Sequence, residues 1–208
     1  MRVTWKIGFL ISLLVGMGSL FSGVSQADFE VRDSHIMKFG TVEVGLQTGH
    51  WQAITAVGNA DSANRSAVVV MPHIGVVVTD EIELGLMSGV FEVAVEPVGA
   101  SFYQPFSASL FGVVFVGEYN FLSFGRWMPY WDWGVGVSWT DLAPRVPEQS
   151  TSLEFLLETG PGIQYFLTED TALSAAVRLQ HMSNGNVGDR NVGINAVLGL
   201  FGFSFYIP

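Results

Sequence analysis

Hydrophobic and polar residues alternate one by one along most of the chain beyond residue 40. Between residues 41 and 49, for example, Val42, Val44 and Leu46 alternate with polar residues or glycine. A period of two is typical of β-strands that have one apolar and one polar face. The pattern predicts eight strands, over residues 40–51, 66–79, 82–96, 106–121, 127–141, 153–167, 171–183 and 191–205.

The length and the number of these strands favour a barrel that spans a membrane. Most exceed the roughly 9–11 residues that cross a bilayer, and single-chain bacterial barrels have an even number of strands. Charged residues recur on the polar faces and cannot point into lipid cheaply, so we expect them to fill a narrow lumen. This expected lumen network comprises Glu43, Glu92, Asp132, Glu154, Glu158 and Arg178.

The predicted connections alternate between long and short. The first, third, fifth and seventh cover residues 52–65, 97–105, 142–152 and 184–190, whereas the others cover 80–81, 122–126 and 168–170. Membrane barrels have long external loops and short periplasmic turns. The alternative, a soluble periplasmic sandwich, has no reason to alternate in this way. We therefore predict an all-β fold: an eight-stranded antiparallel transmembrane β-barrel with up-and-down meander topology.

The first 27 residues have the pattern of a secretory signal peptide. Arg2 and Lys6 precede an apolar stretch over residues 7–24, and small residues at 25–27 suit a cleavage site. The alternative is a retained membrane anchor, since the stretch is nearly long enough to span a bilayer. We expect a cleaved signal over residues 1–27, a barrel domain over residues 28–208, and a location in the bacterial outer membrane.

Composition excludes several classes of function. The chain has no cysteine, so disulfides and thiolate metal sites are unavailable. Without Arg2 and Lys6 it keeps 7 of its 9 basic residues against 19 acidic ones, a net charge of −12 that would repel nucleic acid. We expect no metal and no cofactor, because three histidines are isolated in the sequence: His35, His50 and His73. Tryptophans are expected in girdles at the membrane surfaces, among them Trp51, Trp127 and Trp139.

His181 and Ser183 carry the candidate chemistry. Two residues apart on a strand, they project from one face with Cα atoms ~7 Å apart, so the imidazole could activate the hydroxyl as a nucleophile. The other residues of that face are apolar: Leu173, Ala175, Val177 and Leu179. With both termini in the periplasm, this strand runs outward and ends near the outer leaflet. The lipid there is lipopolysaccharide, whose lipid A carries ester-linked acyl chains.

The following hairpin offers partners for this pair. A hairpin centred on Gly188 would place Asn195 directly opposite His181, where its carbonyl oxygen could orient the imidazole. The side chains of Asn184 and Asn191 and the amide of Gly185 are candidate oxyanion donors, although Asn-Gly pairs are also common in plain turns. Three arginines in predicted external loops could pair with lipid A phosphates or simply be solvated: Arg65, Arg145 and Arg190.

In these features the chain resembles the lipid A 3-O-deacylase (PagL-type) family of outer-membrane barrels, often labelled acyloxyacyl hydrolase-like. The resemblance rests on His181-x-Ser183-Asn184 and Asn191-x-Gly193 in the last hairpin. It implies an eight-stranded barrel that hydrolyses the acyl ester at the 3-position of lipid A. It also implies serine as nucleophile, histidine as base and a carboxylate that orients the histidine.

Asn195 departs from the family pattern, which has a glutamate at this position. An amide can hold the imidazole tautomer but cannot stabilise the imidazolium, and the same change in a serine protease lowers turnover by about 10⁴. The sequence thus predicts an outer-membrane esterase that acts on lipid A. The alternatives are an inactive barrel with a structural or lipid-binding role and a small pore, for which the lumen is too narrow. A homodimer is left open.

Overall fold

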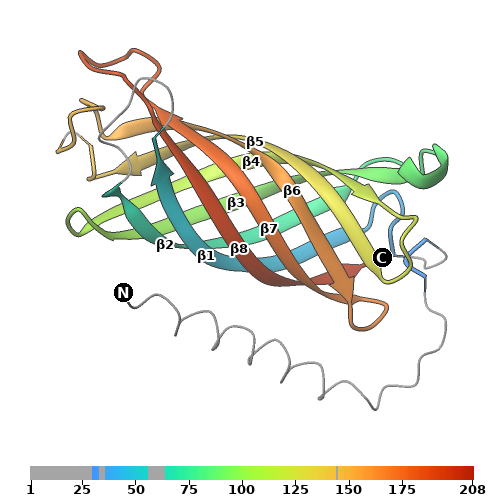
Figure 1. Ribbon diagram of the computed structural model, residues 1–208. Coiled ribbons are helices and arrows are strands. Elements are labelled where there is room, and N and C mark those ends of the chain that lie inside the picture. The colour runs from blue at the N-terminus through green and yellow to red at the C-terminus, as the bar shows by residue number, and fades with distance from the viewer. Residues whose placement is uncertain (1–29, 33–35, 56–63, 144) are drawn as a thin grey trace, which may run out of the picture.

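A computed structural model describes residues 30–32, 36–55, 64–143 and 145–208 and shows a closed barrel of eight antiparallel strands (Figure 1). Each strand pairs with the next, and the last pairs with the first. The predicted fold class is confirmed. The strands are β1 (Val42–Ile54), β2 (Ser66–Val77), β3 (Gly89–Gln104), β4 (Ala108–Phe121), β5 (Trp127–Thr140), β6 (Leu153–Phe166), β7 (Thr171–Ser183) and β8 (Ile194–Ile207). The predicted signal peptide lies outside the described residues.

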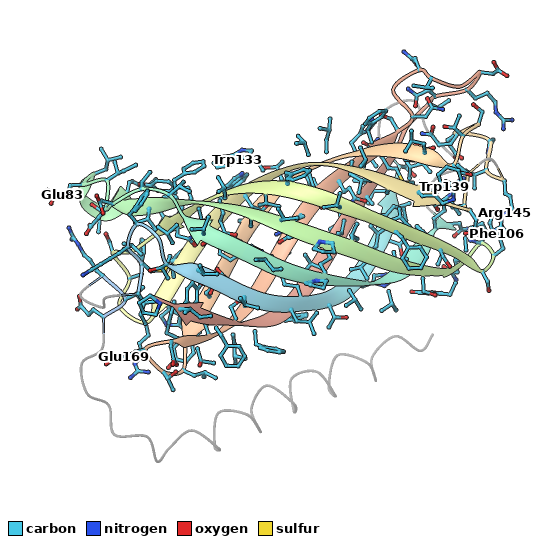
Figure 2. The ribbon with its side chains drawn as sticks, turned by 180° about the vertical axis from the view of Figure 1, so that it is seen from behind. Glu83, Phe106, Trp133, Trp139, Arg145 and Glu169 are labelled. Atoms are coloured by element: carbon cyan, nitrogen blue, oxygen red, sulfur yellow. The ribbon has the colours of Figure 1, made fainter. Side chains whose placement is uncertain are left out.

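Alternation along each strand produces an apolar outer wall and a mixed inner wall. On β5, Trp131, Trp133 and Val135 point outward and are 41–57% exposed, whereas Asp132 between them is buried. Trp133 stands on the outside of the barrel in Figure 2. Such an apolar belt around a closed sheet is what a barrel needs in order to lie in a bilayer. Among the described residues no helix is long and apolar enough to span a membrane.

The two ends of the barrel carry different segments. We call the end with the start of β1 and the end of β8 the terminal end, and the opposite end the loop end. The loop end carries the described residues 105–107, 141–143, 145–152 and 184–193, and the terminal end carries 78–88, 122–126 and 167–170. Figure 2 shows Glu83 and Glu169 at the terminal end and Phe106 and Arg145 at the loop end.

Strand β3 corrects the predicted boundaries. It runs from Gly89 to Gln104 instead of residues 82–96, so the second connection is long and the third is short, and the predicted alternation of lengths fails there. The predicted strand stops before Pro97, whereas this proline lies within β3 and points outward. The register on either side places it opposite Pro72 on β2, within a gap in the β2–β3 ladder. Two prolines facing each other leave no N–H unpaired between them.

The interior is layered along the barrel axis. An apolar cluster closes the terminal end, with Val31 and Met37 from the N-terminal segment packed against Phe166 and Tyr206. Polar side chains fill the middle, and a second apolar cluster fills the half toward the loop end. The expected lumen residues are all buried in this interior: Glu43, Glu92, Asp132, Glu154, Glu158 and Arg178.

Trp51 corrects one further expectation. It was assigned to a girdle at the membrane surface, yet it is 3% exposed and points into the lumen, where its indole N–H donates to Gln180 Oε1 at 2.7 Å. Its odd position places it on the same face of β1 as Glu43, so the alternation itself indicated the inner wall. Trp127 and Trp139 are 50% and 63% exposed at the two ends of β5, as girdle residues should be.

Candidate active site

His181 and Ser183 lie on the outer wall at the loop end of β7. The inward positions of this strand are Gln180 and Met182, which are buried, so the two candidate residues project to the outside, where both are half-buried. The structure therefore places this face of β7 where a lipid would contact it, and away from the lumen.

Asn195 lies directly across from His181 on β8, as the hairpin register predicted. Its side-chain oxygen is 2.9 Å from His181 Nδ1. Because a carbonyl oxygen can only accept, Nδ1 is the donor in this arrangement, and in a neutral ring Nε2 is then the acceptor. That tautomer is the one a general base on the Nε2 side requires.

Gly193 forms the surface against which the imidazole lies. Its φ is +78°, and a Cβ built on it would come within 2.5 Å of His181 Cε1. Any other residue would be strained by the backbone conformation and would also push the ring aside. Gly193 was noted in the family motif without a role, and the structure supplies one: it makes room for the imidazole.

Ser183 shares the face of His181 but is not hydrogen-bonded to it. Among the described residues, no hydrogen bond joins the Ser183 hydroxyl to the imidazole, and Ser183 lies opposite Phe155 on β6. Contacts between nucleophile and base are often loose without substrate and tighten in the reacting complex. His181 and Ser183 thus lie on the same face of β7, and the imidazole is already oriented by Asn195.

A shallow groove of about 540 Å³ runs along the outer wall beside His181 and Asn195. Its lining crosses from β5 to the end of β1 and includes Ile54, Trp133, Leu157 and Leu179. The groove is largely apolar, and the imidazole is the titratable side chain on its outward face. An alkyl chain lying in it would contact aliphatic and aromatic groups and would end near the histidine.

The loop after β7 is held by its asparagines. Asn184 is fully buried and its side chain donates to Arg190 O at 2.8 Å and accepts from the Asn186 amide at 3.1 Å. Asn191 Oδ1 accepts from the Asn184 amide at 3.1 Å, and its Nδ2 donates to Asn186 Oδ1. Gly185 is exposed at a positive φ of +61° next to this network. Both side chains expected to bind an oxyanion therefore build the turn that presents Gly185.

The three candidate arginines differ in what they contact. Arg65 is buried and its guanidinium pairs with Glu148 at 2.6 Å, so it does not face the outside. Arg145 is exposed, bonds Asp141 and lies 4.2 Å over the ring of Phe106. Arg190 is exposed beside the site, with one guanidinium nitrogen on Gln149 O.

Residues 145–152 support the loop at residues 184–193, which we call the site loop. The Val192 amide donates to Glu148 O at 2.9 Å, and Gln149 forms an isolated bridge with Asn191. Ser150 exchanges hydrogen bonds with the Arg190 backbone, and a Cβ at Gly188 would meet its hydroxyl. These contacts join segments 40 residues apart, and neither a spacing nor a motif marks them.

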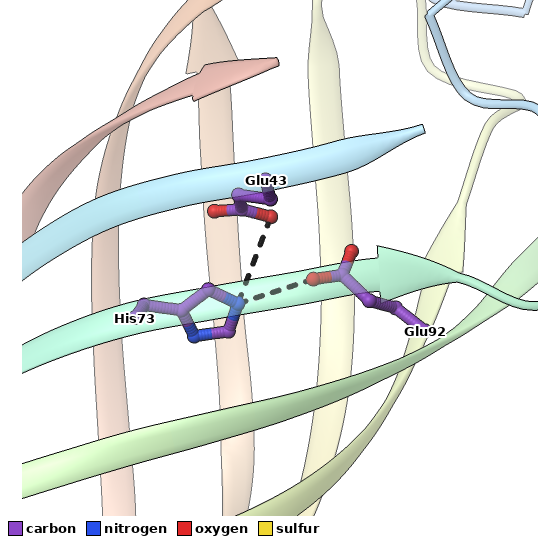
Figure 3. Close-up of side chains that lie close together, drawn as sticks. All are labelled: Glu43, His73 and Glu92. Carbon is purple, nitrogen blue, oxygen red and sulfur yellow. Dashed lines mark hydrogen bonds and ion pairs between the residues drawn. The ribbon is translucent and has the colours of Figure 1, made fainter. Parts of the chain in front are cut away.

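His73 corrects the expectation of an isolated histidine. It is 2% exposed in the lumen, with Nδ1 2.8 Å from Glu96 Oε1 and Nε2 3.1 Å from Glu92 Oε1. Glu43 on the neighbouring strand lies 4.0 Å from the same Nε2 (Figure 3). The partners come from the two strands that flank β2, so spacing along the chain could not reveal them.

Comparisons with known proteins agree with the barrel fold. A model of the lipid A 3-O-deacylase (PagL) family matches residues 85–204. The crystal structure of the outer membrane enzyme PagL superposes with a TM-score of 0.54 at 18% identity, covering 77% of this chain and 97% of that one. Neisserial surface protein A superposes with a TM-score of 0.51 at 18% identity, covering 80% and 98%. No curated protein sequence matches the chain significantly.

Proposed function

This chain belongs to the lipid A 3-O-deacylase (PagL) family, and on that premise we propose that it removes the 3-O-linked acyl chain from lipid A through His181 and Ser183. The observation that carries the proposal is the contact between His181 Nδ1 and Asn195 Oδ1 on the outer wall. It orients a base toward lipid, where no water-soluble substrate would meet it. The apolar groove beside it supports an acyl chain as the bound group.

The proposed chemistry is acyl transfer to serine. Ser183 Oγ attacks the ester carbonyl carbon while His181 Nε2 takes the hydroxyl proton. The tetrahedral intermediate collapses, and the imidazolium returns that proton to the departing sugar oxygen, so that lipid A leaves with a free hydroxyl group. Water, deprotonated by the same nitrogen, then attacks the acyl-serine, and the imidazolium returns the proton to Ser183 Oγ as the fatty acid leaves. Asn195 keeps the imidazole in one tautomer through both steps.

The donor best placed to stabilise the oxyanion is a backbone N–H in the loop after β7. The Gly185 N–H has no hydrogen bond within the described part of the chain, and it lies two residues beyond Ser183. Asn184 and Asn191 contribute by holding this turn. Arg190 and Arg145 are exposed enough to meet lipid A phosphates, whereas Arg65 is occupied by Glu148.

The test is mass spectrometry of lipid A from outer membranes that carry the wild-type protein or Ser183→Ala. Loss of one hydroxyacyl chain with the wild type alone supports the serine mechanism. Ser174→Ala is the matched control, because this serine lies on the same strand but faces the lumen. Loss of the chain with all three proteins, or with none while all three are folded, contradicts the proposal.

A second function is favoured by Asn195 itself. An amide cannot neutralise the imidazolium, so the same barrel could bind lipid without cleaving it. A wild-type protein that binds lipid A in the outer membrane and leaves its acyl chains intact would support this second function.

A further inference from the structure

The lumen holds a cluster of ligand-type side chains that the proposed function does not use. Glu43 on β1, His73 on β2 and Glu92 on β3 each offer one atom, and these atoms all lie within 4.8 Å of one another. All three side chains are at most 2% exposed. Figure 3 shows both carboxylates turned toward the same imidazole nitrogen.

The distances within this cluster suit a shared cation. His73 Nε2 is 3.1 Å from Glu92 Oε1 and 4.0 Å from Glu43 Oε2. Ligands bound at roughly 2.0–2.2 Å from a zinc ion lie about 3–4 Å from one another. The three atoms therefore need only small movements to coordinate one ion.

The other imidazole nitrogen is held as it is in known metal sites. His73 Nδ1 lies 2.8 Å from Glu96 Oε1, and Arg178 donates to both oxygens of Glu96. A metal-binding histidine usually donates its second N–H to a carboxylate, which fixes the ring and the tautomer. Glu96 supplies that carboxylate and is itself fixed.

Two carboxylates, one within the cluster and one beside it, each have a buried oxygen without a hydrogen-bond partner among the described residues. Glu92 Oε2 and Glu118 Oε1 have no hydrogen bond among the described residues, although Glu92 is fully buried and Glu118 is 2% exposed. The register places Glu118 directly across from Glu92 on β4. Uncompensated carboxylates are costly in a low-dielectric interior, and a dication beside them removes that cost.

Gly75 leaves the space in which the Glu92 carboxylate approaches His73. Gly75 faces the lumen opposite Glu43, and a Cβ built on it would come within 2.9 Å of His73 Nε2 and would overlap the Glu92 carboxylate. Any side chain at position 75 would therefore fill the space between the ligands.

We propose that Glu43, His73 and Glu92 form a binding site for one divalent transition-metal cation inside the barrel. Imidazole with carboxylates favours ions such as Zn²⁺ over Mg²⁺, because Mg²⁺ prefers oxygen ligands alone. The inference is independent of the proposed esterase, whose residues lie on the outer wall.

The experiment measures Zn²⁺ bound to the protein expressed without residues 1–27, the predicted signal. Because apolar side chains pack on both sides of the polar layer, Zn²⁺ is offered both during refolding into detergent and afterwards. We expect about one Zn²⁺ per chain after gel filtration, a rise in melting temperature with Zn²⁺, and no rise with the same concentration of Mg²⁺.

Three variants and one control test the assignment. His73→Gln, Glu92→Gln and Gly75→Ala should each weaken Zn²⁺ binding at least about tenfold, whereas Glu154→Gln removes a lumen carboxylate outside the cluster and should retain it. Equal Zn²⁺ binding in wild type and His73→Gln overturns the proposal. Should the variants fail to fold, X-ray absorption of Zn²⁺ on wild type decides: one imidazole nitrogen with oxygens supports the site, and oxygens alone overturn it.

Discussion

Gly193 and Asn195 fix the imidazole of His181 from two sides. Gly193 leaves the space in which the ring lies, and Asn195 accepts from Nδ1. The pairing of His181 with Asn195 could be predicted from the sequence, because a hairpin register depends only on where its turn is centred. The close contact with Gly193 could not, since it depends on a positive φ and a side-chain rotamer.

Gly193→Ala should lower acyl release from lipid A at least about tenfold, because the added Cβ would displace the imidazole. Gly85→Ala is the matched control: its φ is also positive, at +64°, but a Cβ there meets nothing within 4 Å. Both variants carry the same backbone cost of about 1–2 kcal/mol. Equal rates for the two variants, measured on folded protein, would show that the ring position does not matter.

Asn195→Glu should raise the rate of acyl release, because a carboxylate stabilises the imidazolium as well as the tautomer. The reverse change in a serine protease costs about 10⁴ in turnover, so a gain of tenfold or more is expected. Asn195→Leu should abolish the hydrogen bond to Nδ1 and lower the rate. A rate that is the same in all three proteins would remove residue 195 from the mechanism.

The strands were easier to predict than the segments that join them. Alternation identified all eight strands and assigned the faces of β7 correctly, because the side chains on the outer face of a strand are apolar over its whole length. It failed for β3, where residues 82–88 continue an apolar pattern into a turn and Pro97 lies inside the strand. The contacts that support the site loop were beyond prediction, because they form between two irregular segments.

The ion pair between Arg65 and Glu148 ties the loop at residues 141–152 to the first connection. Both side chains are buried, so Glu148→Gln leaves the guanidinium without its counter-charge and should destabilise this end by about 3–5 kcal/mol. The Val192 amide bonds Glu148 O, so the site loop should loosen and acyl release should fall.

Urea unfolding and the rate of acyl release are the two measurements for this pair. The double variant Arg65→Met with Glu148→Leu should be less destabilised than Glu148→Gln, because no buried charge is left alone. If the single variant unfolds at the wild-type urea concentration, the pair does not support the loop.

In the barrel as a whole, the residues that stabilise the fold and the residues proposed for chemistry lie on opposite walls. The inner wall carries a buried network centred on Arg178, which bonds Glu96 and Asp132, and the outer wall carries the candidate active site. The sequence predicted Arg178 and Asp132 as members of this network, because alternation sorts residues by wall, but it did not include Glu96. It missed His73 as a member, because proximity across strands needs the register of three neighbours.

Arg178→Met should lower the free energy of unfolding by about 3–5 kcal/mol, since it removes the guanidinium that pairs with both buried carboxylates, Glu96 and Asp132. Acyl release per folded molecule should change less than about twofold, because His181 points to the other side of the sheet. The measurement is urea unfolding followed by activity on the folded fraction. A stable but inactive variant would show that the two walls are coupled.

Because His181 faces outward, the substrate concentration that governs the rate is the one within the lipid layer and not the one in bulk solution. A substrate that approaches through the plane of the leaflet meets the groove by lateral diffusion, in two dimensions, and never enters bulk water. On the proposed function, the rate in mixed micelles should follow the mole fraction of lipid A in each micelle. Diluting the whole sample with buffer at fixed mole fraction should leave the rate per enzyme unchanged, whereas adding inert detergent should lower it.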